Sequence, residues 1–127
     1  MPKYDADRFD PPAPVANVNL RNPESGASIS DVPMLLDTGA DVTLLPRDFV
    51  DQLGITPVED KVYEVEGFDG GTKLAEVVQL ELVFLGRKFK GLFLLIDMPT
   101  GILGRNILNE VALLLDGPHG SWKEHKS

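Results

Sequence analysis

The fold of this chain is decided by the stretch Leu35–Leu36–Asp37–Thr38–Gly39–Ala40–Asp41–Val42–Thr43–Leu44–Leu45. A small polar turn with a carboxylate lies here between two apolar runs. The pattern is typical of a buried strand that ends at Asp37 and holds its carboxylate on a tight turn. Gly39 permits backbone angles and a close approach that a side chain would prevent, and the Thr38 hydroxyl can bond to nearby backbone groups. An aspartate that merely caps a turn explains Asp37 as well, so this turn does not by itself establish a site.

A second segment, Gly101–Ile102–Leu103–Gly104–Arg105–Asn106, lies more than half a chain further on. In this order, the two segments resemble the retropepsin-like aspartic proteases, which are the retroviral proteases and their cellular relatives. The resemblance rests on Asp37–Thr38–Gly39–Ala40–Asp41 and Ile102–Leu103–Gly104–Arg105–Asn106, and it covers roughly residues 15–117. It implies a mainly β fold, a closed barrel or sandwich of the acid protease type, with one or two short helices and a flap hairpin.

The length and composition predict one folded domain with short extensions. The chain has 127 residues and 43% hydrophobic residues, as an ordinary globular domain does. Residues 1–14 are polar and proline-rich, and we expect a flexible N-terminal arm there. Residues 15–118 would form the retropepsin-like domain, and residues 119–127 a polar C-terminal tail.

Charge and composition argue against several partners. The net charge of −8 would repel the phosphates of nucleic acids, so no nucleic-acid partner is expected. The absence of cysteine removes disulfides and thiolate chemistry. The N-terminus has no apolar signal core, and the longest apolar run is too short to span a bilayer. We therefore expect a cytoplasmic protein without a membrane partner.

Hydrophobic periodicity predicts a chain of short strands and two helices. Thr72–Leu85 alternates most clearly, with Leu74, Val78, Leu80, Leu82 and Phe84 on one face and Lys73, Gln79 and Glu81 on the other. Phe89–Ile96 is nearly continuous, as in a strand buried on both faces. The other expected elements are strands at 15–20, 28–36, 42–45, 61–66, 102–103 and 113–115, and helices at 46–53 and 105–111.

A glycine-rich tip joins two of the expected strands. Gly67, Phe68, Asp69, Gly70 and Gly71 form this tip, which an ordinary hairpin loop would also explain. Its position after the Asp-Thr-Gly turn favours a flap that closes over an extended substrate and excludes water. Phe68 would then offer an apolar group to the ligand.

Carboxylates are the groups left for peptide hydrolysis. The chain has no cysteine, no H-E-x-x-H pattern and no recognisable Ser-His-Asp arrangement, and His119 and His125 lie in the tail. Two neighbouring carboxyl groups cannot both ionise cheaply, so one keeps its proton while the other is charged. The charged member can activate a water, and the protonated member can polarise the substrate carbonyl.

Only one Asp-Thr-Gly occurs in the chain, so the second carboxylate must come from a second copy. The prediction is a homodimer with one active site, in which both copies contribute Asp37 and a peptide or protein is cut. The resemblance implies further roles. Thr38 would bond across the two-fold axis, Gly39 and Asp41 would present backbone groups to the substrate, and Arg105 would pair with Asp41. Ala40 belongs to the same supporting turn.

Two other readings of the same residues stay open. A dimeric module that keeps the fold for binding or scaffolding would need no catalytic pair. A metal loop built from Asp37 and Asp41 would lack the repeated Asp or Asn ligands and terminal Glu of a calcium loop. Histidines in a polar tail are more typical of solvated surface than of a metal site. No metal and no cofactor is therefore expected.

Overall fold

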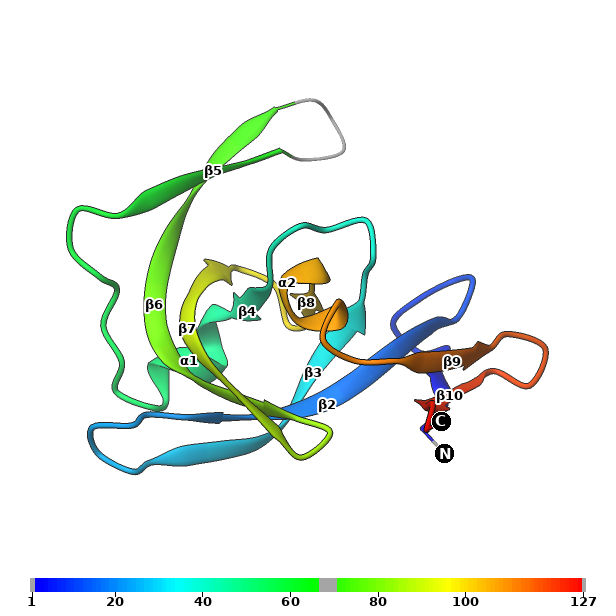
Figure 1. Cartoon of the computed structure of the whole chain (residues 1–127). Helices are drawn as coiled ribbons and strands as arrows, with labels where there is room; N and C mark the ends of the chain where they lie inside the picture. The colour runs from blue at the N-terminus through cyan, green and yellow to red at the C-terminus, as the bar shows by residue number, and fades with distance from the viewer. Residues whose placement is uncertain (1, 67–70, 127) are drawn as a thin grey trace.

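The computed structural model describes residues 2–66 and 71–126, and strands dominate it (Figure 1). Its elements in chain order are β1 (Tyr4–Asp5), β2 (Ala13–Arg21), β3 (Ser28–Leu36), β4 (Leu44–Pro46), α1 (Arg47–Asp51), β5 (Val62–Glu66), β6 (Thr72–Phe84), β7 (Arg87–Ile96), β8 (Gly101–Leu103), α2 (Arg105–Leu108), β9 (Leu113–Asp116) and β10 (Ser121–Glu124).

Eight strands form one sheet that closes on itself. Their order is β1-β2-β3-β8-β4-β7-β6-β5, and β2 also pairs with β6. This additional pairing joins the two sides of the sheet, so that β2, β3, β8, β4, β7 and β6 form a ring around the main core (Figure 1). The mainly β fold with two short helices is thus confirmed.

The path of the chain brings the two sequence segments together. β8 lies between β3 and β4, parallel to the first and antiparallel to the second. Ile102 in β8 pairs with Leu35 on one side and with Leu44 on the other. The loop 37–43 therefore starts and ends on strands that flank β8, and α2 follows β8 directly beside this loop.

Apolar residues gather on both faces of these strands. The main cluster lies inside the ring and includes Leu45 and Leu103. A second, smaller cluster lies on the opposite face, where β4 and β7 meet the part of β6 that leads into the β5–β6 hairpin. Its buried members are Leu44, Ala75, Val77 and Leu94, and Val65, Ile96 and Ile102 pack against it.

The long strand β6 differs from the simple alternation in two places. Leu74 was expected with the core-facing residues, yet 72% of it is exposed because the β5–β6 hairpin extends beyond the body. Glu81 was expected on the polar face but is only 2% exposed; in the sheet it lies between Arg21 of β2 and Lys90 of β7. In β7, continuous burial is limited to Phe93–Leu95.

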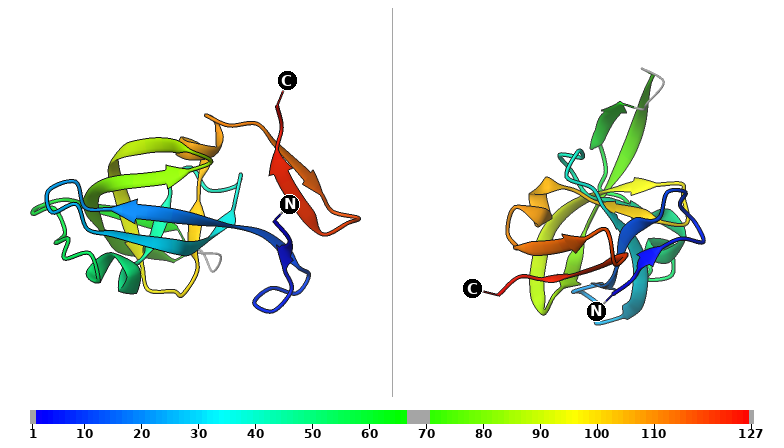
Figure 2. Two further views of the ribbon diagram at one scale, coloured as in Figure 1. Left: turned by 90° about the horizontal axis from the view of Figure 1, so that it is seen from below. Right: turned by 90° about the vertical axis from the view of Figure 1, so that its right-hand side faces the viewer.

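The arm and the tail also differ from the expectation, because they pair with each other. Tyr4 in β1 donates its backbone N–H to the Gly120 carbonyl at 2.7 Å, and Trp122 in β10 donates to the Pro2 carbonyl at 3.0 Å. β1 also pairs with β2, and β10 pairs with β9. The chain ends therefore lie next to one another (Figure 2).

Trp122 anchors this terminal assembly on the body. The indole is 3% exposed, and its Nε1 donates to the Val15 carbonyl at 3.1 Å. Its ring lies 6.1 Å from the ring of Phe84, centroid to centroid, in a tilted arrangement. Backbone hydrogen bonds thus join the start of the arm to the tail beside one buried aromatic, which a polar and proline-rich composition does not reveal.

Both helices are shorter than predicted. Pro46 was expected as the first helical residue, but it ends β4 and caps α1, which runs only to Asp51. Gly54 follows with φ at +68°. α2 ends at Leu108 and continues as turns to Val111. Neither described helix has the length and apolar character that a bilayer crossing requires.

Candidate active site

The Asp37 turn is held by backbone groups on both sides. The Asp37 N–H donates to the Leu103 carbonyl at 3.1 Å, which ties the end of β3 to β8. The Ala40 N–H donates a hydrogen bond to the Asp37 carbonyl at 3.2 Å and closes the turn. Gly39 donates its N–H to Asp37 Oδ1 at 2.9 Å, and an added Cβ at Gly39 would lie 3.1 Å from that oxygen. Glycine therefore allows the turn to approach the carboxylate closely.

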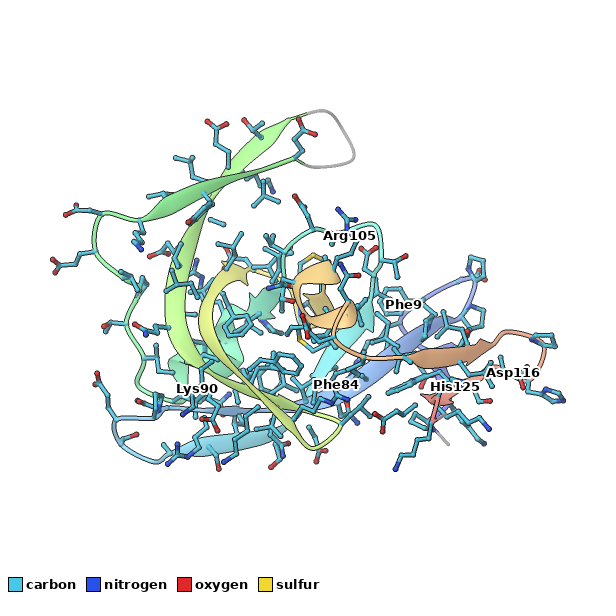
Figure 3. The ribbon with its side chains drawn as sticks, viewed as in Figure 1. Phe9, Phe84, Lys90, Arg105, Asp116 and His125 are labelled. Carbon is cyan, nitrogen blue, oxygen red and sulfur yellow. The ribbon has the colours of Figure 1, made fainter. Side chains whose placement is uncertain are left out.

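Arg105 holds the turn from below, at the start of α2 (Figure 3). Its backbone N–H donates to the Ala40 carbonyl at 2.8 Å, and its Nη1 donates to the Thr38 carbonyl at 2.7 Å. No ion pair joins Arg105 to Asp41 in the described chain, so the expected pairing differs from the structure. The guanidinium binds the backbone of the turn instead, and Asp41 is exposed.

Thr43 is a supporting residue that the sequence reasoning missed. It is 1% exposed, and its Oγ1 accepts the Gly104 N–H at 3.1 Å and donates to Asn106 Oδ1 at 2.7 Å. The signal was a threonine between apolar residues at the start of a strand, because a buried hydroxyl needs partners. These bonds join the far end of the loop to the Gly104–Asn106 segment.

Gly104 packs directly beneath the loop. A Cβ at this position would collide with the carbonyl group of Val42 and lie 3.0 Å from the Ala40 oxygen. Only glycine lets the end of β8 approach the loop this closely. The two sequence segments thus form one hydrogen-bonded, closely packed unit, in which the second supports the first.

The carboxylate itself is accessible. Asp37 is partly exposed, and its neighbours Thr38 and Gly39 are exposed. Oδ1 accepts the Gly39 N–H, whereas no hydrogen bond to Oδ2 occurs within residues 2–66 and 71–126. In that same part of the chain, no hydrogen bond or ion pair links Asp37 to a second acidic side chain. One copy therefore presents one carboxylate at an open surface.

The β5–β6 hairpin extends from the body on the side where the loop 37–43 lies (Figures 1 and 2). Four of the tip residues predicted as a flap, Gly67, Phe68, Asp69 and Gly70, lie outside the described residues. Gly71 is described and leads into β6.

A charged cluster fixes the root of this hairpin. Arg47 binds Asp97 Oδ1 through Nε at 2.6 Å and Glu76 Oε1 through Nη1 at 2.8 Å. Arg47 thereby links the start of α1 to β6 and to the segment between β7 and β8. The hydrogen bond to Asp97, followed by that to Glu76, raises the pKa of Arg47 against the opposing effect of burial, so the guanidinium stays charged.

Two hollows in the surface lie elsewhere. One of about 430 Å³ lies between β7 and α2, and one of about 200 Å³ lies beside Arg47 and Met98. Neither is lined by Asp37. Chemically, the turn of a single copy supplies one positioned proton acceptor but not the acid–base pair that amide hydrolysis requires.

Comparisons with known proteins identify relatives of this arrangement. A model of a family described as aspartyl protease matches residues 25–107, which include both the Asp37 turn and the Gly104–Arg105 segment. Among solved structures, the chain is similar to the EIAV protease in complex with the inhibitor HBY-793. The two share 27% sequence identity with a TM-score of 0.57, and the match covers 77% of this chain and 86% of the other.

Proposed function

Because this chain belongs to the aspartyl protease family, we propose that it is an endopeptidase whose hydrolytic centre forms when two copies bring their Asp37 carboxylates together. One observation carries the proposal. Asp37 is held on a turn that Arg105, Thr43 and Gly104 support, while its Oδ2 has no partner in the described chain. A merely structural aspartate at a turn would not need this support on both sides.

The second copy follows from chemistry. A carboxylate can take a proton from water, but the leaving amine also needs a proton donor. Two carboxyl groups brought together share one proton, because like charges at that separation cannot both ionise cheaply. The chain offers only one Asp-Thr-Gly turn, so a two-fold axis beside Asp37 is the economical way to build the pair.

The two Asp37 side chains can then supply the proton acceptor and the proton donor that each step of the reaction needs. The ionised Asp37 takes a proton from a water that attacks the scissile carbonyl carbon. The Asp37 of the other copy, which carries the proton, transfers it to the carbonyl oxygen, so that the tetrahedral intermediate is a neutral gem-diol. The C–N bond breaks when the amine nitrogen receives the proton that the first Asp37 took from water. One hydroxyl of the intermediate returns its proton to the other Asp37, and the carboxyl group of the product forms without a covalent intermediate.

The neighbouring residues take supporting roles in this proposal. Thr38, Gly39 and Ala40 shape the turn, and Arg105 holds it through the carbonyls of Thr38 and Ala40. Asp41 is exposed next to the turn and is proposed to contact the backbone of the substrate. An extended peptide would lie between the turn and the β5–β6 hairpin, with the tip residues 67–71 as the flap.

The test compares Asp37→Asn with Asp31→Asn. Both changes remove one carboxylate, and Asp31 is an exposed residue with φ at +60°, a conformation that asparagine tolerates. Purified proteins are incubated with a peptide library, and the products are identified by mass spectrometry. We expect Asp37→Asn to abolish cleavage and Asp31→Asn to retain it. Equal cleavage by both variants would contradict the proposal, and no cleavage by the unaltered protein would favour a non-catalytic binding module.

A further inference from the structure

The β5–β6 hairpin has two chemically different faces. In the antiparallel pairing, Val65 lies opposite Lys73, and Tyr63 lies opposite Ala75. Directly paired residues share a face, as do residues two apart along one strand. Tyr63, Val65, Lys73 and Ala75 therefore form one face, which we call the inner face. The other face carries Val62, Glu64, Glu66, Thr72, Leu74 and Glu76.

Burial shows where the inner face points. Ala75 is buried together with Val77 against Leu44 and Leu94, and Val65 packs against the same cluster. Leu44 follows the Asp37 loop, and it pairs with Ile102, which also packs against this cluster. The inner face therefore turns toward the strands that carry the loop 37–43.

Lys73 is the charged residue of this face. Its three companions are Tyr63, Val65 and Ala75, and Lys73 itself is exposed. In the part of the chain that the structure describes, its ammonium group makes no ion pair. The carboxylates of the hairpin strands, Glu64, Glu66 and Glu76, belong to the opposite face. Among the described residues of the hairpin, a cation without a partner thus lies on an otherwise uncharged face, which turns toward the strands that carry the loop 37–43.

We propose that Lys73 makes this protease prefer peptides with an aspartate or glutamate near the scissile bond. The inference rests on the proposed function and names its substrate class. Successive side chains of an extended peptide point alternately toward the hairpin and toward the body. An acidic side chain that points toward the hairpin would pair with the Lys73 ammonium, in a place partly shielded from water by the substrate. Because the whole chain carries a net charge of −8, long-range attraction cannot supply this preference, and the contact must be local.

The experiment uses peptides that share one cleavable bond and differ only in Glu, Gln or Lys at each flanking position. For the unaltered protein, we expect kcat/KM to be about tenfold higher for the Glu peptide than for the Gln peptide at one position. High salt should reduce this ratio, because it screens the ion pair. Lys73→Met should remove this preference, so that kcat/KM becomes equal for the Glu and Gln peptides, and Lys73→Glu should favour the Lys peptide. Lys123→Met removes the same charge from β10 and should leave the preference unchanged. Equal kcat/KM for Glu and Gln at every position would overturn the inference.

A binding measurement separates this inference from the proposed function. Fluorescently labelled Glu and Gln peptides are titrated with Asp37→Asn, with and without Lys73→Met, and anisotropy is recorded. We expect Asp37→Asn to bind the Glu peptide about tenfold more tightly than the Gln peptide. The variant that also carries Lys73→Met should bind the two peptides with equal affinity. This outcome supports the role of Lys73 even if the protein cleaves nothing. If both proteins bind the two peptides equally while the unaltered protein cuts them, the proposed function stands and the role of Lys73 is refuted.

Discussion

At the scale of single residues, Gly104 shows how closely the two halves of the site approach. A methyl group there would collide with the Val42 carbonyl group and crowd the Ala40 oxygen, and both belong to the backbone of the loop. We expect Gly104→Ala to lower the free energy of unfolding by about 1–3 kcal/mol and to reduce peptide cleavage strongly. Urea denaturation and a peptide assay measure the two effects. Gly117→Ala is the matched control, because a Cβ at Gly117 meets nothing within 4 Å. Equal stability of the two variants would contradict this account.

Much of the residue-scale arrangement was predictable. The Asp37 turn and the Gly104–Arg105 segment were recognised from sequence, and the structure places them in contact through the Arg105 hydrogen bonds. The acceptor of Arg105 was not predictable, since the carbonyl of Thr38 and the carboxylate of Asp41 lie in the same short turn. Only three-dimensional geometry distinguishes such neighbours.

At the scale of secondary-structure elements, the terminal strands depend on Trp122. Its indole is buried against Phe84 and donates to the Val15 carbonyl. We expect Trp122→Ala to lower the free energy of unfolding by about 3–5 kcal/mol, because it leaves a large cavity and an unpaired carbonyl. Lys123→Ala, an exposed change on the same strand, should alter stability by less than about 0.5 kcal/mol. Thermal unfolding of both variants tests this, and a small effect at Trp122 would show that β10 contributes little to the body.

For the buried carboxylate in β6, we expect the opposite effect: its replacement should not lower the free energy of unfolding. Glu81 Oε1 has no hydrogen-bond partner among the described residues, and Oε2 lies 3.9 Å from Nζ of Lys90, which is 76% exposed. Replacing Glu81 by methionine removes an incompletely paired charge and leaves no buried cation behind. We expect Glu81→Met to keep or raise the free energy of unfolding, by up to about 1–2 kcal/mol. Gln79→Met on the same strand controls for the added methionine, and a clear loss of stability specific to Glu81→Met would refute the reasoning.

Strands were easier to predict than their surroundings. Alternation in Thr72–Leu85 identified β6, but it could not reveal that Glu81 lies between two paired strands or that Leu74 lies beyond the core. Burial depends on which elements lie alongside, and periodicity describes only the strand itself. The arm and the tail were harder still, because their order comes from pairing with each other across the whole length of the chain.

At the scale of the whole molecule, the proposed function requires two copies. When unaltered protein is mixed with an equal amount of Asp37→Asn and dimers re-form at random, activity per unaltered chain should fall to about half. The variant chain would occupy half of the partner positions without supplying a competent carboxylate. Peptide cleavage measured after dilution, mixing and reconcentration checks this, with Asp31→Asn as the control that should not inhibit. Activity that is simply additive would mean that each chain works alone.

The closed sheet was predictable only through family resemblance. No local pattern states that β2 will pair with both β3 and β6, since these contacts join distant parts of the chain. The place of β8 between β3 and β4 is equally non-local. What the residues did indicate was the joint presence of the Asp37 turn and the Gly104–Arg105 segment, which is meaningful only in such a topology.

The meeting of Tyr4 with Gly120 and of Pro2 with Trp122 has a consequence for protein engineering. Because residues near the two ends of the described chain are neighbours, a short glycine-serine linker could join them in a circular permutant. The new termini would lie in the turn between β2 and β3, around Ser25 and Gly26. Such a circular permutant would secure the β1–β10 contacts covalently. Labels could then be attached at the new ends in the β2–β3 hairpin, away from the proposed catalytic turn.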